Sequence, residues 1–238
     1  METLDQSIKF SWNVNVESAY IITIKDHPVS EAMSRRCAES CDRVGMPWKK
    51  WDAFDGTKGQ ISVPEHLKEK SWLKWIKVVN CALAKTEICN VLSHVALWAH
   101  CVEIDKPIVI LEHDAIMLEK VLEHPAINAI LYLGSIEQVK NDMYSNPIPI
   151  MGQLNENYRF ILRTHAYSVD PIMARRLLSN LLMNGLTTSI DVYIRSDIFT
   201  QIQMGVRAFD KADGMSTSPE KTEKQNDPHL LRINNKIL

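Results

Sequence analysis

The sequence lacks strong net charge, long apolar runs and a recognisable signal peptide. Its 238 residues carry a formal net charge of -2, so no global basic field favours nucleic acid or an anionic membrane, although a local basic patch is compatible with this balance. No apolar run approaches the roughly 18 residues of a membrane-spanning helix. Residues 1–15 carry acids and lack the apolar core of a signal peptide. We therefore expect a soluble, cytoplasmic protein without a membrane span.

Two familiar motifs are also missing. The five cysteines form no C-x-x-C pair and none of the usual zinc spacings, so we interpret them as reduced thiols. Cys37 and Cys41 lie four residues apart on an expected helix, where small buried side chains are favoured over a metal site. No G-x-G-x-x-G follows the first expected strand, which disfavours a dinucleotide-binding enzyme.

The residues that are present predict one α/β domain. Hydrophobic residues make up 45% and charged residues 24%, which is enough apolar material for a sizeable core. Apolar runs typical of buried strands alternate with segments of helical period. The expected strands are residues 19–24, 48–54, 108–111, 130–133 and 165–169, and the expected helices are 30–44, 85–102, 118–129 and 171–184. This order predicts a single domain over residues 1–238 with a mostly parallel central sheet flanked by helices.

Two segments do not fit the alternation. Residues 211–227 are polar and poor in bulky apolar side chains, so we expect a flexible loop or flap. Residues 68–77 mix lysines with tryptophans, a combination that could stack on bases or sugars. The favoured interpretation is an amphipathic helix that buries Trp72, Ile76 and Val79 and leaves the lysines outside.

The apolar run 108–111 ends in Glu112-His113-Asp114. A buried strand that delivers carboxylates at its C-terminal end can hold a metal ion under a phosphorylated ligand. Because strand side chains alternate, Glu112 and Asp114 can share a face while His113 points elsewhere. Their hard oxygen atoms suit Mn²⁺ or Mg²⁺. The alternative is a strand that simply ends in a solvated loop.

Short motifs recur in a fixed order along the chain. They are His27-Pro28, Arg35-Arg36, residues 53–56, Glu87-Ile88, Leu92-Ser93-His94, Leu97-Trp98, residues 106–114, residues 133–135, Ala166-Tyr167, residues 174–177 and Ile190-Asp191. Each is weak alone, but their order and spacing over about residues 19–195 resemble glycosyltransferase family 25, the family of lipooligosaccharide and collagen galactosyl- or glucosyltransferases. The chain departs from the usual Glu-Asp-Asp of that family at His113. It also has Thr86 and Cys89 where glycines commonly flank the helix-opening glutamate.

The resemblance implies a Rossmann-like domain of the GT-A type and a metal-dependent, inverting transfer. A hexose, galactose or glucose, would move from a UDP-sugar to an acceptor hydroxyl. A divalent cation would stabilise the diphosphate leaving group as a Lewis acid. Asp114 is the first choice for direct ligation, with Glu112 contacting metal-bound water or the donor ribose. His229 is the candidate third ligand, although an ordinary surface histidine fits equally well.

Inversion calls for a carboxylate base that takes the proton of the acceptor hydroxyl. Asp191 is the candidate, and a helix cap or a partner for Arg195 is the alternative for it. The resemblance places Ser93 and His94 beside the donor, whereas helical period alone indicates a buried, hydrogen-bonded histidine.

Four further residues are expected to contact the donor. Asp55 follows the second strand and could hold the base or ribose. Thr23 and Ile24 would offer strand backbone to the base. Arg35 could meet phosphate, although a surface charge on the helix is an equally good interpretation.

The acceptor is left open by the sequence. A saccharide is the first expectation from the resemblance and a hydroxylysine side chain the second. A hydroxymethylated nucleobase in DNA is the third, but the net charge gives it no support. A non-catalytic nucleotide-sugar-binding module, in which His113 marks lost metal chemistry, is the main alternative to an enzyme. A phosphohydrolase or nuclease would need more clustered carboxylates.

Overall fold

The computed structural model describes residues 13–79, 83–125, 129–133, 164–195, 198–199, 202–204 and 208–210. Within these residues a six-stranded sheet forms the centre, in the order β3-β2-β4-β8-β7-β9. The strands are β3 Trp48–Asp52, β2 Ala19–Thr23, β4 Ile108–Glu112, β8 Ala166–Val169, β7 Ile130–Tyr132 and β9 Ile202–Met204. The five strands predicted from apolar runs are thus confirmed within one or two residues at their ends.

The sheet is mixed, because one of its six strands, β8, runs against the others. β2 pairs in parallel with both β3 and β4, and β7 pairs in parallel with β9. β8 runs antiparallel to both of its neighbours, β4 and β7. The apolar pattern of a doubly covered strand is the same in either direction, so it could not reveal this reversal.

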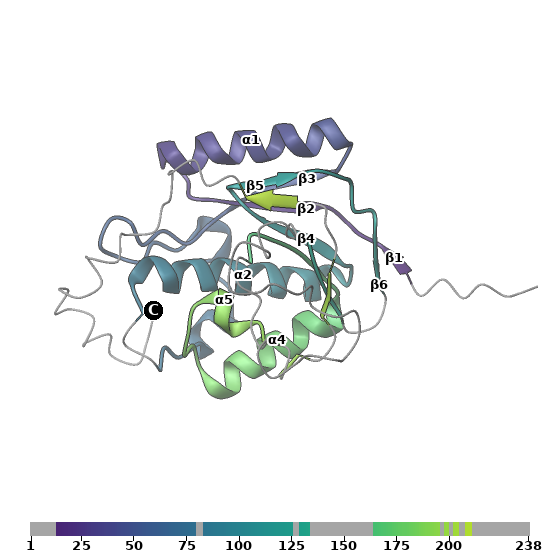
Figure 1. Ribbon diagram of the computed structural model, residues 1–238. Helices are drawn as coiled ribbons and strands as arrows, with labels where there is room; N and C mark the ends of the chain where they lie inside the picture. The colour runs from purple at the N-terminus through teal and green to yellow at the C-terminus, as the bar shows by residue number, and fades with distance from the viewer. Residues whose placement is uncertain are drawn as a thin grey trace, which may run out of the picture.

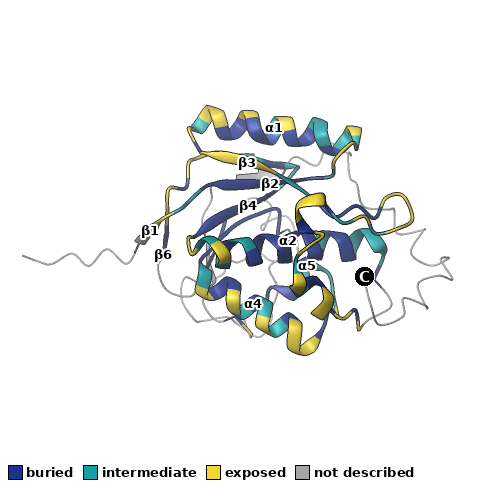
Figure 2. Ribbon diagram, turned by 180° about the vertical axis from the view of Figure 1, so that it is seen from behind, coloured by how far each residue is buried: buried dark blue, intermediate teal, exposed yellow. Residues whose placement is uncertain are grey.

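Helices cover both faces of the sheet (Figure 1). α1 (Pro28–Val44) lies on one face, and α2 (Lys85–Ile104) and α4 (Pro171–Asn184) lie on the other. Alternate residues of β2 and β4 separate into two cores. Ala19, Ile21, Val109 and Leu111 pack toward α1, whereas Tyr20, Ile22, Ile108 and Ile110 pack with α2 and α4. Figure 2 shows β2 and β4 buried, the edge strand β3 largely exposed, and the helices exposed along their outer sides.

The ends of α1 and α4 follow the local capping chemistry. The Asp170 carboxylate accepts hydrogen bonds from the backbone N–H groups of Ile172 and Met173, with Pro171 at the first helical position, as predicted. α1 ends at Gly45, whose φ of 70° is the left-handed conformation that favours glycine.

Two predicted helices are wrong. Residues 118–122 form no helix, and the chain continues into the strand β6 (Glu123–Pro125), which pairs with β1 (Asn13–Asn15). Its centre, His124, is buried and its ring nitrogens contact the Ser168 hydroxyl and the Ala129 carbonyl, so tertiary contacts override the local period.

Residues 68–79 contain the 3-10 helix η2 (Ser71–Trp75) instead of one amphipathic helix. Another 3-10 helix, η1 (Glu65–Leu67), precedes it. Ile76 is buried as expected, but Val79 is 59% exposed.

The remaining described elements are short. β5 (Ala115–Met117) pairs with β10 (Ala208–Asp210), and α5 covers Ile190–Tyr193. The four cysteines in the described part of the chain are free and buried. Over the same residues, no helix has both the length and the apolar character needed to cross a membrane. The predicted flap at residues 211–227 lies outside the described residues.

Candidate active site

A cavity opens where β2 and β4 end, beside the first half of α2. It is lined by the last residues of β2, the turn after β3, one side of α2 and the three residues that begin with Glu112. These are Ile22, Ile24, Ala53, Phe54, Gly56, Thr57, Thr86, Cys89, Asn90, Ser93, Glu112, His113 and Asp114. Ligands of α/β sheets bind outside the carboxyl ends of the strands, so the cavity has the expected position.

Glu112 is held at this cavity by two side chains of α2. Its Oε1 accepts a hydrogen bond from Asn90 Nδ2 at 3.1 Å and lies 3.2 Å from His94 Nε2. Burial raises the pKa of Glu112, but the hydrogen bonds from His94 and Asn90 outweigh it and lower the pKa to about 2. The carboxylate, 23% exposed, is therefore ionised at neutral pH.

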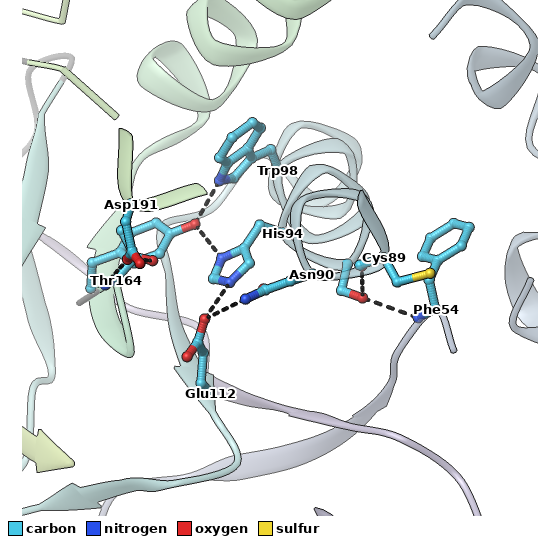
Figure 3. A network of polar contacts seen from close by, with 10 residues as sticks. Phe54, Cys89, Asn90, His94, Trp98, Glu112, Thr164 and Asp191 are labelled. Carbon is cyan, nitrogen blue, oxygen red and sulfur yellow. Dashed lines mark hydrogen bonds and ion pairs between the residues drawn. The ribbon is translucent and has the colours of Figure 1, made fainter. Parts of the chain in front are cut away.

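A chain of buried groups stands behind Glu112 (Figure 3). Trp98 Nε1 donates to the Tyr167 hydroxyl at 2.8 Å, and that hydroxyl lies 2.9 Å from His94 Nδ1. Tryptophan can only donate and an ionised carboxylate can only accept. A proton on Nε2 lets His94 donate to Glu112 and lets Tyr167 donate to Nδ1, which satisfies every member. The chain thus fixes both the tautomer of His94 and the place of Glu112.

The two residues after Glu112 also line the cavity. We expected strand alternation to turn His113 away from the face that Glu112 and Asp114 share. β4 ends at Glu112, however, and all three residues line the cavity. His113 Nδ1 lies 3.2 Å from the hydroxyl of Ser30 at the start of α1, and burial lowers the pKa of this histidine. Asp114 is close enough to α1 that its charge adds to the effects of Cys41 and burial in raising the pKa of Cys37.

The Ser93 hydroxyl makes two hydrogen bonds that fix the wall of the cavity. Its Oγ donates to the Cys89 carbonyl at 2.7 Å and accepts from the Phe54 N–H at 3.0 Å. Gly56 lies against the start of α2, where an added Cβ would come within 2.9 Å of the Lys85 backbone. The predicted turn at residues 53–56 is therefore packed tightly on α2.

Three residues predicted to contact the donor either make hydrogen bonds within the fold or lie away from the cavity. The Thr23 hydroxyl bonds to Ser34 of α1 at 2.7 Å, and the Thr23 carbonyl accepts from the Ala53 N–H. Ile24 lines the cavity, but its N–H donates to the Ser30 hydroxyl at 2.9 Å. Arg35 is exposed on α1 and does not line the cavity.

Asp55 shapes the turn beside the cavity. Its Oδ1 accepts from the N–H and the hydroxyl of Thr57 at 2.8 and 2.6 Å, and its Oδ2 lies 3.8 Å from Lys58 Nζ. This carboxylate positions Gly56 and Thr57, which line the cavity in its place.

Asp191 lies in the first turn of α5, close to Glu112 but not in the cavity wall. Its Oδ1 accepts from the N–H and the hydroxyl of Thr164, both at 2.9 Å. Burial raises the pKa of Asp191 and the charge of Glu112 adds to this, while the Thr164 hydrogen bonds oppose it. In Figure 3, His94 and Glu112 lie between Asp191 and Phe54.

Asn90 and Thr86 are polar residues of the cavity that were not predicted as donor contacts. Asn90 precedes His94 by four residues on α2, and this spacing on one helix face was the available signal. Thr86 was noted only as a departure from the family pattern. Its Oγ1 is buried and has no hydrogen-bond partner among the residues that the structure describes.

The predicted metal ligands are only partly visible. Glu112 and Asp114 line one cavity, while His229 lies outside the described residues. Within the described ranges, no three His, Cys, Asp or Glu side chains are grouped to hold a metal ion.

The cavity, its carboxylates and Asp191 all fall within residues 17–194, the part of the chain that matches a known family model. That model is described as glycosyltransferase family 25 (LPS biosynthesis protein). A search of curated proteins gave no match to the chain. Since the matched residues are well over half of the sequence, the chain belongs to glycosyltransferase family 25.

Proposed function

We propose that the protein transfers a hexose, galactose or glucose, from a UDP-sugar to an acceptor hydroxyl, with a divalent cation and with inversion at the sugar carbon. The domain would be of the GT-A type. The observation that carries the proposal is the pair of carboxylates, Glu112 and Asp114, in one cavity at the end of β4. Membership of a glycosyltransferase family supplies the reaction class.

The donor set suits a hard divalent cation. Asp114 would ligate Mn²⁺ or Mg²⁺ directly. Glu112 would contact metal-bound water or the donor ribose, because its Oε1 already accepts from Asn90 and His94. The cation supplies Lewis-acid stabilisation of the diphosphate that leaves. His229 is proposed as a further ligand.

Residues around the carboxylates would hold the donor. The Thr86 hydroxyl, which has no hydrogen-bond partner among the described residues, is a hydrogen-bonding group inside the cavity. Ile24 and the turn that Asp55 and Ser93 fix would form its apolar and backbone wall. The Trp98–Tyr167–His94 chain keeps Glu112 ionised and in place, so no reorganisation is needed when the donor binds.

Asp191 would act as the base toward the acceptor. Thr164 fixes Oδ1 and leaves Oδ2 without a hydrogen bond from the described residues. Its raised pKa favours proton uptake from an alcohol. Because Asp191 lies on the α5 side of Glu112, the acceptor would approach from that side and the donor from the cavity. A saccharide is the acceptor class that we propose first.

Calorimetric titration of UDP with and without Mn²⁺ tests the metal assignment. We expect UDP binding that depends on Mn²⁺ and is abolished in Asp114→Ala. Asp105→Asn is the matched control, because Asp105 is exposed beyond the far end of α2 in a backbone conformation that asparagine tolerates. Unchanged metal-dependent binding in Asp114→Ala would remove Asp114 from the metal site. A panel of UDP-sugars and then of acceptors would follow. Metal-dependent UDP binding without transfer to any acceptor would favour the non-catalytic module.

A further inference from the structure

A group of apolar side chains lies exposed where η2 and the end of α4 meet. Met183 is 83% exposed, Trp75 69%, Val79 59% and Leu182 41%. Large apolar side chains scattered singly on a surface are ordinary, but a contiguous patch marks a binding surface. We call these four residues the apolar patch.

Backbone pairing holds the segment after η2 against the end of α4, so the two segments that carry the patch lie side by side. The Val79 N–H donates to the Leu186 carbonyl at 3.0 Å, and the Leu186 N–H donates to the Lys77 carbonyl at 2.7 Å. Gly185 lies so close to Val79 that an added Cβ would come 2.4 Å from Val79 Cγ2. Leu182 of the patch also lines an apolar groove together with Trp72 and Ile76 of the η2 region.

Two exposed lysines, Lys74 and Lys77, border the patch. Ile76 and Val78 are buried while Lys77 and Val79 are exposed, so Lys77 and Val79 point outward together. Lys68 and Lys70 form ion pairs with Glu65 and Glu103. Lys74 and Lys77, in contrast, have no ion-pair partner among the residues that the structure describes.

The patch lies at the same end of the molecule as the candidate active site. β8 runs opposite to β4, and α4 follows β8 and reverses again. The C-terminal end of α4 therefore lies toward the carboxyl ends of β2 and β4, where the cavity opens (Figure 1).

We propose that the apolar patch binds the surface of an anionic lipid bilayer. Trp75, Val79, Leu182 and Met183 would enter the lipid–water interface, and Lys74 and Lys77 would face headgroup phosphates. Tryptophan and aliphatic side chains beside unpaired lysines suit such an interface, whereas lysine is depleted from protein–protein interfaces. If the proposed function holds, this orientation brings the cavity to acceptors carried on lipid. The surface proposal itself does not depend on transfer.

Sedimentation of the full chain with vesicles tests the proposal. Vesicles of phosphatidylcholine with phosphatidylglycerol should bind the protein, and vesicles of phosphatidylcholine alone should bind it less. Lys74→Gln with Lys77→Gln should weaken anionic binding by about fivefold per lysine and remove the preference for anionic lipid. Trp75→Ser with Met183→Ser should weaken binding to both vesicles by about tenfold or more. The replaced side chains are exposed, and circular dichroism would verify folding.

The matched controls lie away from the patch, at the start of α4 and just beyond α2. Ile172→Ser changes a side chain that is 51% exposed at the start of α4, and Lys106→Gln changes an exposed lysine just beyond α2. Both should bind vesicles as the parent does. Failure of the parent to bind anionic vesicles, or parental binding by Trp75→Ser with Met183→Ser, would overturn the proposal. A dimer that Met183→Ser dissociates would do the same, because the patch would then join two copies. UDP binding should be unchanged in all of these variants, which separates this result from the test of the active site.

Discussion

The two faces of the central sheet are joined to their helices by different chemistry. On the α1 face, hydroxyls make the polar links: Ser34 bonds to Thr23 of β2 at 2.7 Å, and Ser40 accepts from the Met117 N–H of β5 at 2.9 Å. On the α2 face, the chain from Trp98 through Tyr167 and His94 ends at a carboxylate.

The difference shows which face of the sheet carries the candidate site. The Ser34 and Ser40 links close a packed layer, and neither reaches a residue that lines the cavity. The α2 chain ends instead at an ionised Glu112 that is partly exposed in a cavity, with Asp191 close enough to feel its charge. Substitution of Ser34 or Ser40 should therefore cost stability alone, whereas substitution of Tyr167 or His94 should cost stability and activity together.

The largest effect should come from Asp191→Asn. Asparagine keeps an oxygen for the Thr164 hydrogen bonds but cannot take up a proton, so transfer should fall by about 10² to 10⁴-fold. UDP binding with Mn²⁺ should be retained, as calorimetry on the same sample would show. In the parent enzyme, the rate should fall as pH decreases toward the raised pKa of Asp191, because the base must be ionised. Transfer at the parental rate by Asp191→Asn would exclude this residue as the base.

Tyr167→Phe compared with Ser34→Ala tests the two faces directly. Removing the Tyr167 hydroxyl deprives buried His94 Nδ1 and Trp98 Nε1 of their partner, so the free energy of unfolding should drop by roughly 2–4 kcal/mol. UDP affinity should fall as well, because His94 no longer holds Glu112. Ser34→Ala removes one hydroxyl link and should cost about 1 kcal/mol with unchanged UDP affinity. Urea unfolding and calorimetry measure both, and equal losses of affinity would erase the distinction between the faces.

The pH dependence of stability gives the smallest effect. The pKa of Glu112 is lowered from 4.5 to about 2 in the folded protein, so its stabilisation is complete above pH 4.5 and is lost as pH falls toward 2. The side chain introduced by Glu112→Gln cannot titrate. Between pH 4.5 and 2, the free energy of unfolding of this variant should therefore decrease by on the order of 2 kcal/mol less than that of the parent. The exposed Glu103→Gln is the control and should follow the parent. If the stability of the parent and of Glu112→Gln depended on pH in the same way, the hydrogen bonds from Trp98 through Tyr167 and His94 would not favour the ionised carboxylate.

The sequence predicted β2, β4, β7 and β8 from their apolar runs, and β3 from the segment that ends at a turn dipeptide. It predicted α1, α2 and α4 from their helical period and from the residues that begin or end them. It could not predict the direction of β8, since alternation is identical either way. It also could not predict that residues 118–122 avoid a helix, because the buried contacts of His124 come from β8 and residue 129.

Part of the site was predictable in the same sense. Residues 112–114 were found because polar side chains ended an apolar strand, and they do line the cavity. Asn90 was missed although its spacing from His94 placed both on one helix face. Tyr167 was also missed as a partner of His94, because residues 73 positions apart meet only through the pairing of β4 with β8.

Hydrogen–deuterium exchange with and without UDP and Mn²⁺ tests the central claim most directly. Nucleotide binding should slow exchange in residues 53–57, 86–93 and 112–114, the segments that line the cavity. Exchange in residues 35–44 of α1 should be unchanged. Slowed exchange that is confined to α1, or that spares residues 112–114, would contradict a donor site at the end of β4.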